Sequence, residues 1–392
     1  MVQTRYNILL PFYLFLASVF SFLVSLFLLQ VFLGLLSLLW IFESWENKKS
    51  AFDKILYAVI LFGLFRLISI IFSVYPSQSV TAIPKEILFY TGFFAMSFYL
   101  KVFDDKKFDW VIYVFSFSAV LVAFIGILQF ILQLVDRAQS FSSGYSTFSS
   151  YLLAALGIYL VLIEFVKWNS KYYWIIGLGI ILTGLITSLG RANIFFALIL
   201  IFIYVLRNKK ILFPAILAVV LAVGLSYLSF MTNSTEVEAR VQAPVQLSDR
   251  DIIWEGAEQI YKEQPVLGFG PRTFHQVFPF PERFADKGIG SWHNDFIQIY
   301  FESGIVGEAG FLFLLVTPFI IGFRLLKKLK KGRSKSITAG ILLAMSGLIL
   351  SALFAGFIDS PVLALVYAFL ISVISRESYI INLNAKSADA DA

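Results

Sequence analysis

The chain has 392 residues, of which 59% are hydrophobic and only 14% are charged, with a mean hydropathy of +0.83. A soluble domain carries about 25% charged residues, so this composition indicates a polytopic membrane protein. The chain has no cysteine, which excludes disulfides, cysteine metal sites and thiol catalysis. The first apolar run is far longer than a signal-peptide core and is interpreted as a retained membrane anchor.

Apolar runs long enough to cross a bilayer recur along the chain. A helix that spans the hydrocarbon core needs about 20 apolar residues. We therefore predict an all-α polytopic membrane fold with twelve transmembrane helices. They are expected at about 8–24, 26–43, 55–74, 86–102, 109–133, 146–166, 172–189, 192–207, 211–230, 304–325, 336–357 and 361–379. The run over 8–42 is too long for one helix, and we divide it near Ser25.

Basic residues are distributed unevenly between the two sides of these predicted spans. With the N-terminus inside, the cytoplasmic loops hold Lys48, Lys49, Lys54, Lys101, Lys106, Lys107, Lys167, Lys171, Arg207, Lys209, Lys210 and the run from Arg324 to Lys335. The short loops on the other side hold only Lys85, Arg137 and Arg191. The positive-inside rule then places both termini in the cytoplasm. We attribute the net charge of +6 to topology and to contacts with membrane lipids, and predict no nucleic-acid partner.

The predicted spans divide the chain into four parts. Residues 1–230 form helices one to nine, 231–292 a long outer loop with short helices, 293–381 helices ten to twelve, and 382–392 a disordered cytoplasmic tail. Within the loop, Ser248 and the acidic residues beside Arg250 predict the start of a helix at about 249–263. Arg250 opposes the helix dipole there. It is either a functional cation or a solvated arginine paired with its neighbours.

The segment from Gly268 to Arg272 is glycine-rich but does not indicate a nucleotide site. It follows no predicted strand and lacks a Gly-Lys-Ser/Thr sequence. We expect a tight turn that returns the chain to the membrane.

His293 is one of only two histidines, and it lies where the polar loop meets the tenth predicted span. We expect Ser291 to cap a helix that begins near Trp292, which places His293 in its first turn. A helix N-terminus disfavours imidazolium, and neutral imidazole is the form that accepts a proton. The alternative is a histidine that only caps the helix. His275 is expected to be an exposed loop residue.

Four other charged positions bear on function. Arg191 lies at the outer end of span seven, where positive charge is depleted, and its planar fork suits phosphate oxygens; the alternative is a snorkelling arginine. Arg66 lies inside span three and is either functional or paired with a distant carboxylate. Glu302 and Glu308 are six residues apart, on different helix faces, which disfavours a two-carboxylate hydrolase. His, Asp and Glu nowhere gather at metal-ligand spacing.

These residues together predict an outward-facing site with one neutral base, His293, and three arginines, Arg191, Arg250 and Arg272. Such a site suits group transfer from a phosphate-bearing lipid. The arginines would hold the leaving diphosphate, and the histidine would deprotonate the attacking hydroxyl.

The sequence also resembles the O-antigen ligase/polymerase superfamily. The resemblance is carried by Arg250-Asp-Ile-Ile-Trp254, Pro265-Val-Leu-Gly-Phe-Gly270, His293-Asn294-Asp295-Phe296 and Glu302-Ser-Gly-Ile-Val-Gly307. It implies a metal-independent, inverting glycosyltransferase without cofactor. This enzyme would take glycan from undecaprenyl diphosphate on the periplasmic face of the bacterial inner membrane. In ligases the acceptor is a sugar of the lipid A core.

The resemblance also implies roles for individual residues. The family's histidine corresponds to His293 and its loop arginine to Arg250. Its arginine after span seven corresponds to Arg191, although Gly190 stands where the family usually has serine. The neighbouring motif residues Trp254, Asn294, Asp295 and Glu302 are expected to support the site.

Three alternatives stay open at the level of sequence. One is a member of the same superfamily that glycosylates protein or makes a teichuronic-type polymer. A polymerase that joins lipid-linked glycan repeat units would share the fold and the histidine motif. A polysaccharide transporter or flippase belongs to a different class and would need charged or broken helices near the bilayer midplane. Only Arg66 meets that description.

Overall fold

The computed structural model describes residues 8–49, 51–165, 168–232, 250–284, 290–330 and 332–390, and every regular element in these ranges is a helix. Seven helices are long and apolar enough to cross a membrane. They are α4 (Lys54–Ile71), α7 (Asp105–Ile131), α8 (Tyr145–Phe165), α11 (Leu212–Thr232), α15 (Asp295–Lys328), α16 (Arg333–Ala352) and α17 (Pro361–Ala390). The chain is thus an all-α, multi-pass membrane protein over its described residues.

Five further helices complete the series of long elements. They are α1 (Leu9–Phe20), α2 (Leu26–Ile41), α6 (Ala82–Val102), α9 (Trp168–Thr187) and α10 (Arg191–Arg207). Each predicted span therefore coincides with one helix, in the predicted order, and Ser25 is the N-cap that separates α1 from α2. Twelve membrane crossings remain a prediction, because only seven helices meet both length and hydropathy requirements.

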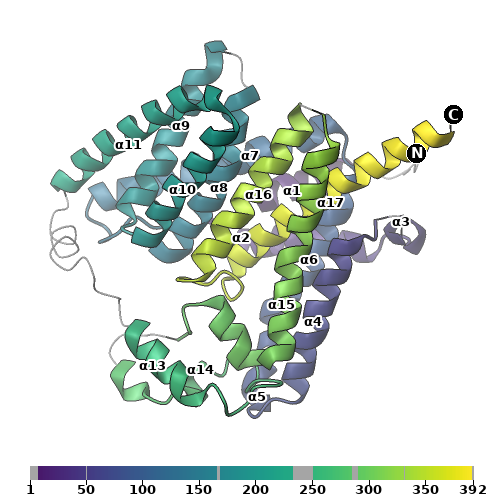
Figure 1. The fold of residues 1–392 in the computed structure, drawn as a ribbon, viewed down its shortest axis with the longest axis vertical. Coiled ribbons are helices and arrows are strands. Elements are labelled where there is room, and N and C mark those ends of the chain that lie inside the picture. The colour runs from purple at the N-terminus through teal and green to yellow at the C-terminus, as the bar shows by residue number, and fades with distance from the viewer. Residues whose placement is uncertain are drawn as a thin grey trace.

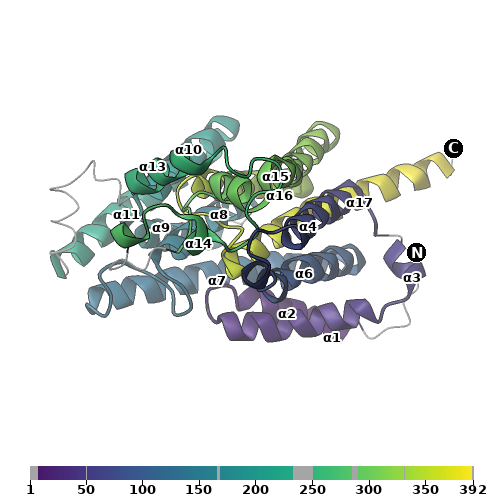
Figure 2. The same ribbon diagram turned by 90° about the horizontal axis from the view of Figure 1, so that it is seen from below.

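The bundle is held by closely packed helix pairs and by close approach at small residues. The helix α8 packs against α16, α6 against α17, α9 against α11, and α4 against α15 (Figure 1). A Cβ added at Gly157 would lie 2.5 Å from the backbone nitrogen of Ala344. Small residues at such positions let backbones approach closely, which drives helix association where no water is present. Figure 2 shows α1 and α2 running side by side along one face of the bundle.

The C-terminal segment is helical over its described residues. We expected residues 382–392 to be disordered, but α17 continues as a helix to Ala390. The tail contains Ala385, Ala388 and Ala390, and alanine has the highest helix propensity. Extending a helix that tertiary packing has already nucleated costs far less than starting a new one.

The outer loop is folded in its described part. The predicted helix at 249–263 is present as α13 (Arg250–Ile260), whereas its predicted cap Ser248 lies outside the described residues. Short helices follow at α14 (Phe274–Val277) and η2 (Pro281–Phe284), and α3 (Trp45–Lys49), α5 (Pro76–Ser79) and η1 (Lys209–Ile211) lie elsewhere in the chain. The loop has its own small hydrophobic core of Ile253, Ile260, Phe269, Phe274, Phe278, Trp292 and Phe301. Because Phe301 belongs to α15, this core docks the loop on the bundle.

Candidate active site

The turn before α15 differs from the sequence prediction. The helix begins at Asp295, and Asn294 is its N-cap, not Ser291. The Asn294 side-chain oxygen accepts hydrogen bonds from the backbone N–H groups of Phe296 (2.9 Å) and Ile297 (3.1 Å). Asparagine in an extended conformation is among the preferred N-caps. His293 therefore lies just before the helix, with a left-handed φ of 49°.

His293 is held in this turn by its buried neighbour Trp292. The indole stacks on Phe301 with ring centroids 4.2 Å apart and meets Phe274 edge-on at 5.0 Å. Both partners belong to the small loop core. A non-glycine residue at positive φ persists only where the surroundings fix it. Trp292 on one side and the Asn294 cap on the other supply that constraint.

The loop between α16 and α17 is fastened to this turn. The Asn294 side-chain amide donates to the carbonyl of Leu353 (3.1 Å). The buried carboxylate of Asp295 accepts the N–H groups of Phe357 (2.6 Å) and Ile358 (3.2 Å). Asn294 and Asp295, which we expected to support the site, thus fix the position of the 353–360 loop relative to His293.

Arg250 also contacts the 353–360 loop between α16 and α17. As the first residue of α13, it donates from its guanidinium to the carbonyl of Phe354 and lies 5.4 Å over that ring. Burial lowers the pKa of Arg250 below its ordinary value; the charge of Arg191 acts in the same direction, and Tyr145 opposes it. The solvated surface arginine considered for this position is therefore not what the structure shows.

The pKa of His293 is lowered from its ordinary value, first by burial and second by the charge of Arg250. The lowered pKa favours the neutral imidazole, as expected from the sequence. The position differs from the expected one, because the helix begins at Asp295 and His293 precedes its N-cap.

Arg191 completes this group of charges. It is the first residue of α10, and its backbone N–H donates to the carbonyl of Leu189 (3.1 Å). One turn on, the Asn193 amide donates to the hydroxyl of Ser149 (2.7 Å), which fixes the start of α10 against α8. The charge of Arg191 acts on the pKa of Arg250, and the charge of Arg250 acts on the pKa of His293, so Arg250 lies within electrostatic range of both residues.

A break in α15 explains two of the sequence motifs. Gly304 has φ 62° and ψ −165°, which interrupts the helix, and the non-helical segment from Pro265 to Gly270 packs against the break. Four backbone hydrogen bonds join the two segments. The N–H groups of Phe269 and Gly270 donate to the carbonyls of Phe301 (2.7 Å) and Glu302 (3.0 Å). In the other direction, the N–H groups of Ile305 and Val306 donate to the carbonyls of Pro265 (2.9 Å) and Val266 (3.3 Å). The segment thus satisfies backbone groups that the break would leave unpaired inside the bundle. It does more than form the tight turn that we predicted.

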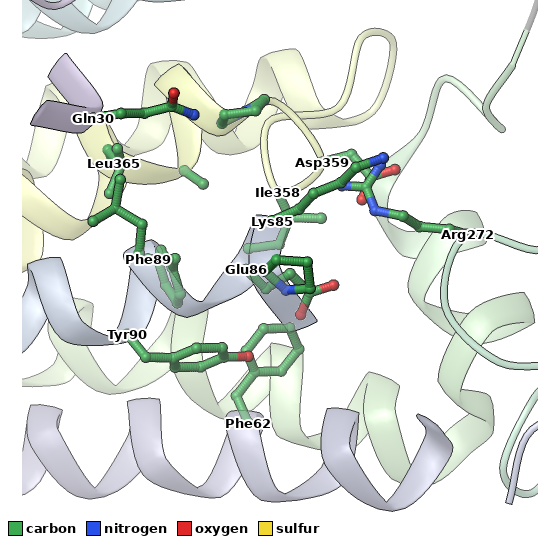
Figure 3. A pocket seen from close by; sticks show the side chains of 14 residues that line it. Gln30, Phe62, Lys85, Glu86, Phe89, Tyr90, Arg272, Ile358, Asp359 and Leu365 are labelled. Carbon is green, nitrogen blue, oxygen red and sulfur yellow. The ribbon is translucent and has the colours of Figure 1, made fainter. Parts of the chain in front are cut away.

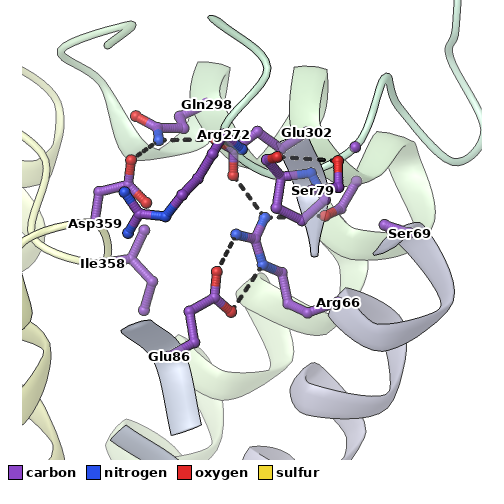
Figure 4. Close-up of polar contacts among 12 residues, drawn as sticks. Arg66, Ser69, Ser79, Glu86, Arg272, Gln298, Glu302, Ile358 and Asp359 are labelled. Atoms are coloured by element: carbon purple, nitrogen blue, oxygen red, sulfur yellow. Dashed lines mark hydrogen bonds and ion pairs between the residues drawn. The ribbon is translucent and has the colours of Figure 1, made fainter. Parts of the chain in front are cut away.

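The partner of Arg66 is now identified. Its guanidinium donates to Glu86 (2.5 Å), to Glu302 (2.7 Å) and to the Ser303 hydroxyl (3.1 Å) (Figure 4). Arg66 is buried, and a buried charge needs such pairing and hydrogen bonding. The second oxygen of Glu302 accepts the backbone N–H of Arg272 (2.9 Å). Glu302 therefore links the membrane helices to the outer loop.

Arg272 and Trp254 lie outside the His293 group. Arg272 lines a cavity with Lys85, Glu86 and Asp359 (Figure 3). Trp254 lies on α13 with 42% of its surface exposed, so it is not part of the loop core.

Sequence reasoning missed three residues of this region: Glu86, Gln298 and Asp359. Gln298 donates both to Glu302 (3.1 Å) and to Asp359. Glu86 interrupts an apolar run, which is a weak signal of a buried partner for Arg66. Gln298 and Asp359 carry no such signal. Over the described ranges, no group of three or more His, Cys, Asp or Glu lies close enough to hold a metal ion.

Comparison with known proteins adds one match. No curated protein matches the chain in sequence. A protein-family model described as O-Antigen ligase matches residues 173–312. That segment contains Arg191, Arg250, Arg272, His293 and Glu302. The match confirms the resemblance of this chain to the O-antigen ligase superfamily.

Proposed function

We propose that the protein is a glycosyltransferase that moves glycan from undecaprenyl diphosphate to a sugar hydroxyl of the lipid A core. The family match supports a glycosyl-transferring enzyme that acts on lipid-linked glycans. The observation that carries the proposal is the grouping of one histidine of lowered pKa with two arginines at the membrane boundary. The set combines a proton acceptor with cations suited to a diphosphate.

The proposed reaction is a single displacement. His293 accepts the proton of the acceptor hydroxyl while that oxygen attacks the anomeric carbon of the donor sugar. The bond between the anomeric carbon and the diphosphate oxygen breaks, which inverts the configuration. Arg191 and Arg250 stabilise the negative charge that develops on the leaving diphosphate. This role for the guanidinium groups makes the proposed mechanism independent of metal and cofactor.

The proposed location is the periplasmic side of the bacterial inner membrane, with both termini cytoplasmic and twelve crossings. The lysine and arginine clusters support this orientation. His293, Arg191 and Arg250 then all lie at the side opposite the basic loops. Membrane lipids surround the bundle and hold both glycolipid substrates at the same boundary.

The alternative is a polymerase that joins lipid-linked O-antigen or exopolysaccharide repeat units. The same base and the same diphosphate ligands would serve it, since only the acceptor differs. A transporter or flippase is less well supported. Arg66, the intramembrane charge that favoured it, is paired with Glu86 and Glu302.

The test is a transfer assay with the purified chain, lipid-linked glycan and lipid A-core. We expect His293→Ala to lower the rate by about 10²–10⁴-fold, the usual contribution of a general base. The other histidine provides a matched control: His275 is exposed, and His275→Ala should leave the rate unchanged. Full activity of His293→Ala would refute the general base. Chain growth on lipid-linked repeats, without use of lipid A-core, would establish the polymerase.

A further inference from the structure

The cavity that Arg272 lines lies among the helices of the bundle, close to the start of α6 and α17. Its volume is about 330 Å³, and α2, α4, α6, Arg272 and the 358–365 segment line it (Figure 3). Cavities that hold small molecules measure about 300–1,000 Å³. The cavity is therefore large enough for one ring of a substrate.

The two walls of this cavity differ in chemistry. One wall is apolar and consists mainly of Phe62, Phe89, Leu88 and Leu365, while the other carries Lys85, Glu86, Arg272 and Asp359. Ammonium and guanidinium groups only donate hydrogen bonds, and ionised carboxylates only accept them. The two cations and the two carboxylates of the lining balance in charge, which gives no preference for an anion such as phosphate. A sugar ring suits both walls, since its hydroxyls donate and accept while its C–H face packs on apolar side chains.

The polar groups are held in place before any ligand arrives. Both oxygens of Glu86 accept from Arg66, at 2.5 and 3.3 Å, and Asp359 accepts from Gln298. Arg272 has a left-handed φ of 61°, and its backbone is bonded on both sides, to Glu302 (2.9 Å) and to Gln78 (3.1 Å). Such a fixed set loses little freedom on binding, which favours affinity.

Donor groups in the cavity still lack partners. The buried Nε of Arg272 has no hydrogen-bond partner among the described residues. Asp359 lies beside the Arg272 guanidinium in Figures 3 and 4, yet within the described ranges no ion pair joins them and none involves Lys85. A buried donor without a partner costs free energy, and such groups require an explanation. The hydroxyl oxygen of a bound sugar would accept a hydrogen bond from the Nε of Arg272.

The cavity shares residues with the loop beside the candidate active site and with a groove between α4 and α6. Ile358, which lines it, donates its N–H to Asp295, two residues after His293. On the opposite side, a mainly apolar groove of about 310 Å³ between α4 and α6 shares Glu86 and Tyr90 with the cavity. A lipid-anchored glycan could thus place its anchor in the groove and its sugar in the cavity.

We propose that this cavity binds a sugar ring of the membrane-anchored acceptor, while Arg191 and Arg250 bind the diphosphate of the donor. The inference rests on the proposed function, because it assigns the second substrate of the same reaction. It separates the three arginines that the sequence grouped together: Arg272 contacts sugar hydroxyls, and the other two contact phosphate.

The test uses acceptor glycan that mild acid has released from its lipid, so that the probe carries no diphosphate. Its binding to the purified full-length chain is measured by calorimetry. We expect Arg272→Gln and Lys85→Gln each to weaken binding by about tenfold or more, as for one hydrogen bond to a charged group. Arg250→Gln should bind the probe as the wild type does. Arg283→Gln is the matched surface control, since its ion pair with Glu255 (2.8 Å) is exposed.

The outcomes separate this inference from the proposed function. Loss of probe binding in the two cavity variants alone supports the acceptor site. Absence of probe binding by the wild type, unchanged binding in both cavity variants, or loss in Arg250→Gln alone would overturn it. Glycan transfer by the same wild-type preparation tests the proposed function separately. Transfer without a cavity effect refutes only the acceptor site, whereas absence of transfer refutes the proposed function.

Discussion

The guanidinium of Arg250 donates a hydrogen bond to the carbonyl of Phe354 and lies 5.4 Å over its ring. The preceding carbonyl, of Leu353, accepts from Asn294. One short loop therefore connects the cation to the residue that follows His293. Because a neutral carbonyl holds Arg250, and no described carboxylate pairs with it, its charge remains available to a substrate anion.

This arrangement predicts how the activity depends on pH. A general base works in its neutral form, so the rate rises with pH through the pKa of His293. Burial and, secondarily, the charge of Arg250 lower that pKa below 6.5. Arg250→Gln removes the charge, raises the pKa and should move the acidic limb of the kcat/KM profile to higher pH. Profiles of transfer rate check this, with Arg283→Gln as the control. An unmoved limb would contradict the coupling of Arg250 to His293.

Asp295 is predicted to act as a positioning residue. Asp295→Ala leaves the N–H groups of Phe357 and Ile358 without their acceptor, at about 1–3 kcal/mol each if they stay buried. The loop that holds Arg250 then loosens. We expect a higher KM for donor and a pH limb that moves in the same direction as in Arg250→Gln, with partial rescue by Asp295→Asn. Asp251→Asn, at an exposed position of α13, is the control. A lower melting temperature with an unchanged pH limb would show a purely structural role.

The sequence predicted the positions of the long helices better than it predicted the turns between them. The position of each long helix follows from an apolar run, because the length and hydropathy of such a run are properties of the local sequence. The cap was wrong because Ser291 and Asn294 are both competent caps, and only the burial of Trp292 decides between them. The outer helix α13 was found from local spacing alone.

Contacts between distant segments explain the remaining differences. Arg66 and Glu302 are 236 residues apart, so their pairing depends on the packing of α4 against α15. The sequence grouped Arg272 with the other arginines because all are predicted to lie on one side of the membrane. In the structure Arg272 instead lines a cavity with Lys85, Glu86 and Asp359, and its backbone is bonded to Glu302.

Gly304 is predicted to be essential for the fold. Its φ of 62° and ψ of −165° belong to a region that only glycine occupies readily, and a Cβ there would collide with the carbonyl group of Val266. Gly304→Ala should cost at least about 1–3 kcal/mol in strain alone. Thermal unfolding in detergent measures this. Gly224→Ala is the control, since a Cβ added there meets no atom within 4 Å. Equal melting temperatures for the two variants would contradict the packing of the 265–270 segment into the break.

The Arg66 network is predicted to contribute strongly to stability. Arg66→Leu leaves Glu86 and Glu302 without their shared cation inside the bundle. Breaking a buried pair by removing one partner costs about 3–5 kcal/mol, whereas an exposed pair contributes about 0–1 kcal/mol. Arg283→Gln, which removes an exposed pair with Glu255, is the matched comparison. Arg66→Lys should lie between the two, because it keeps the charge but loses the planar fork that donates to both carboxylates. If Arg66→Leu unfolds at the same temperature as Arg283→Gln, the network does not stabilise the fold, and a role in substrate handling alone becomes the better explanation.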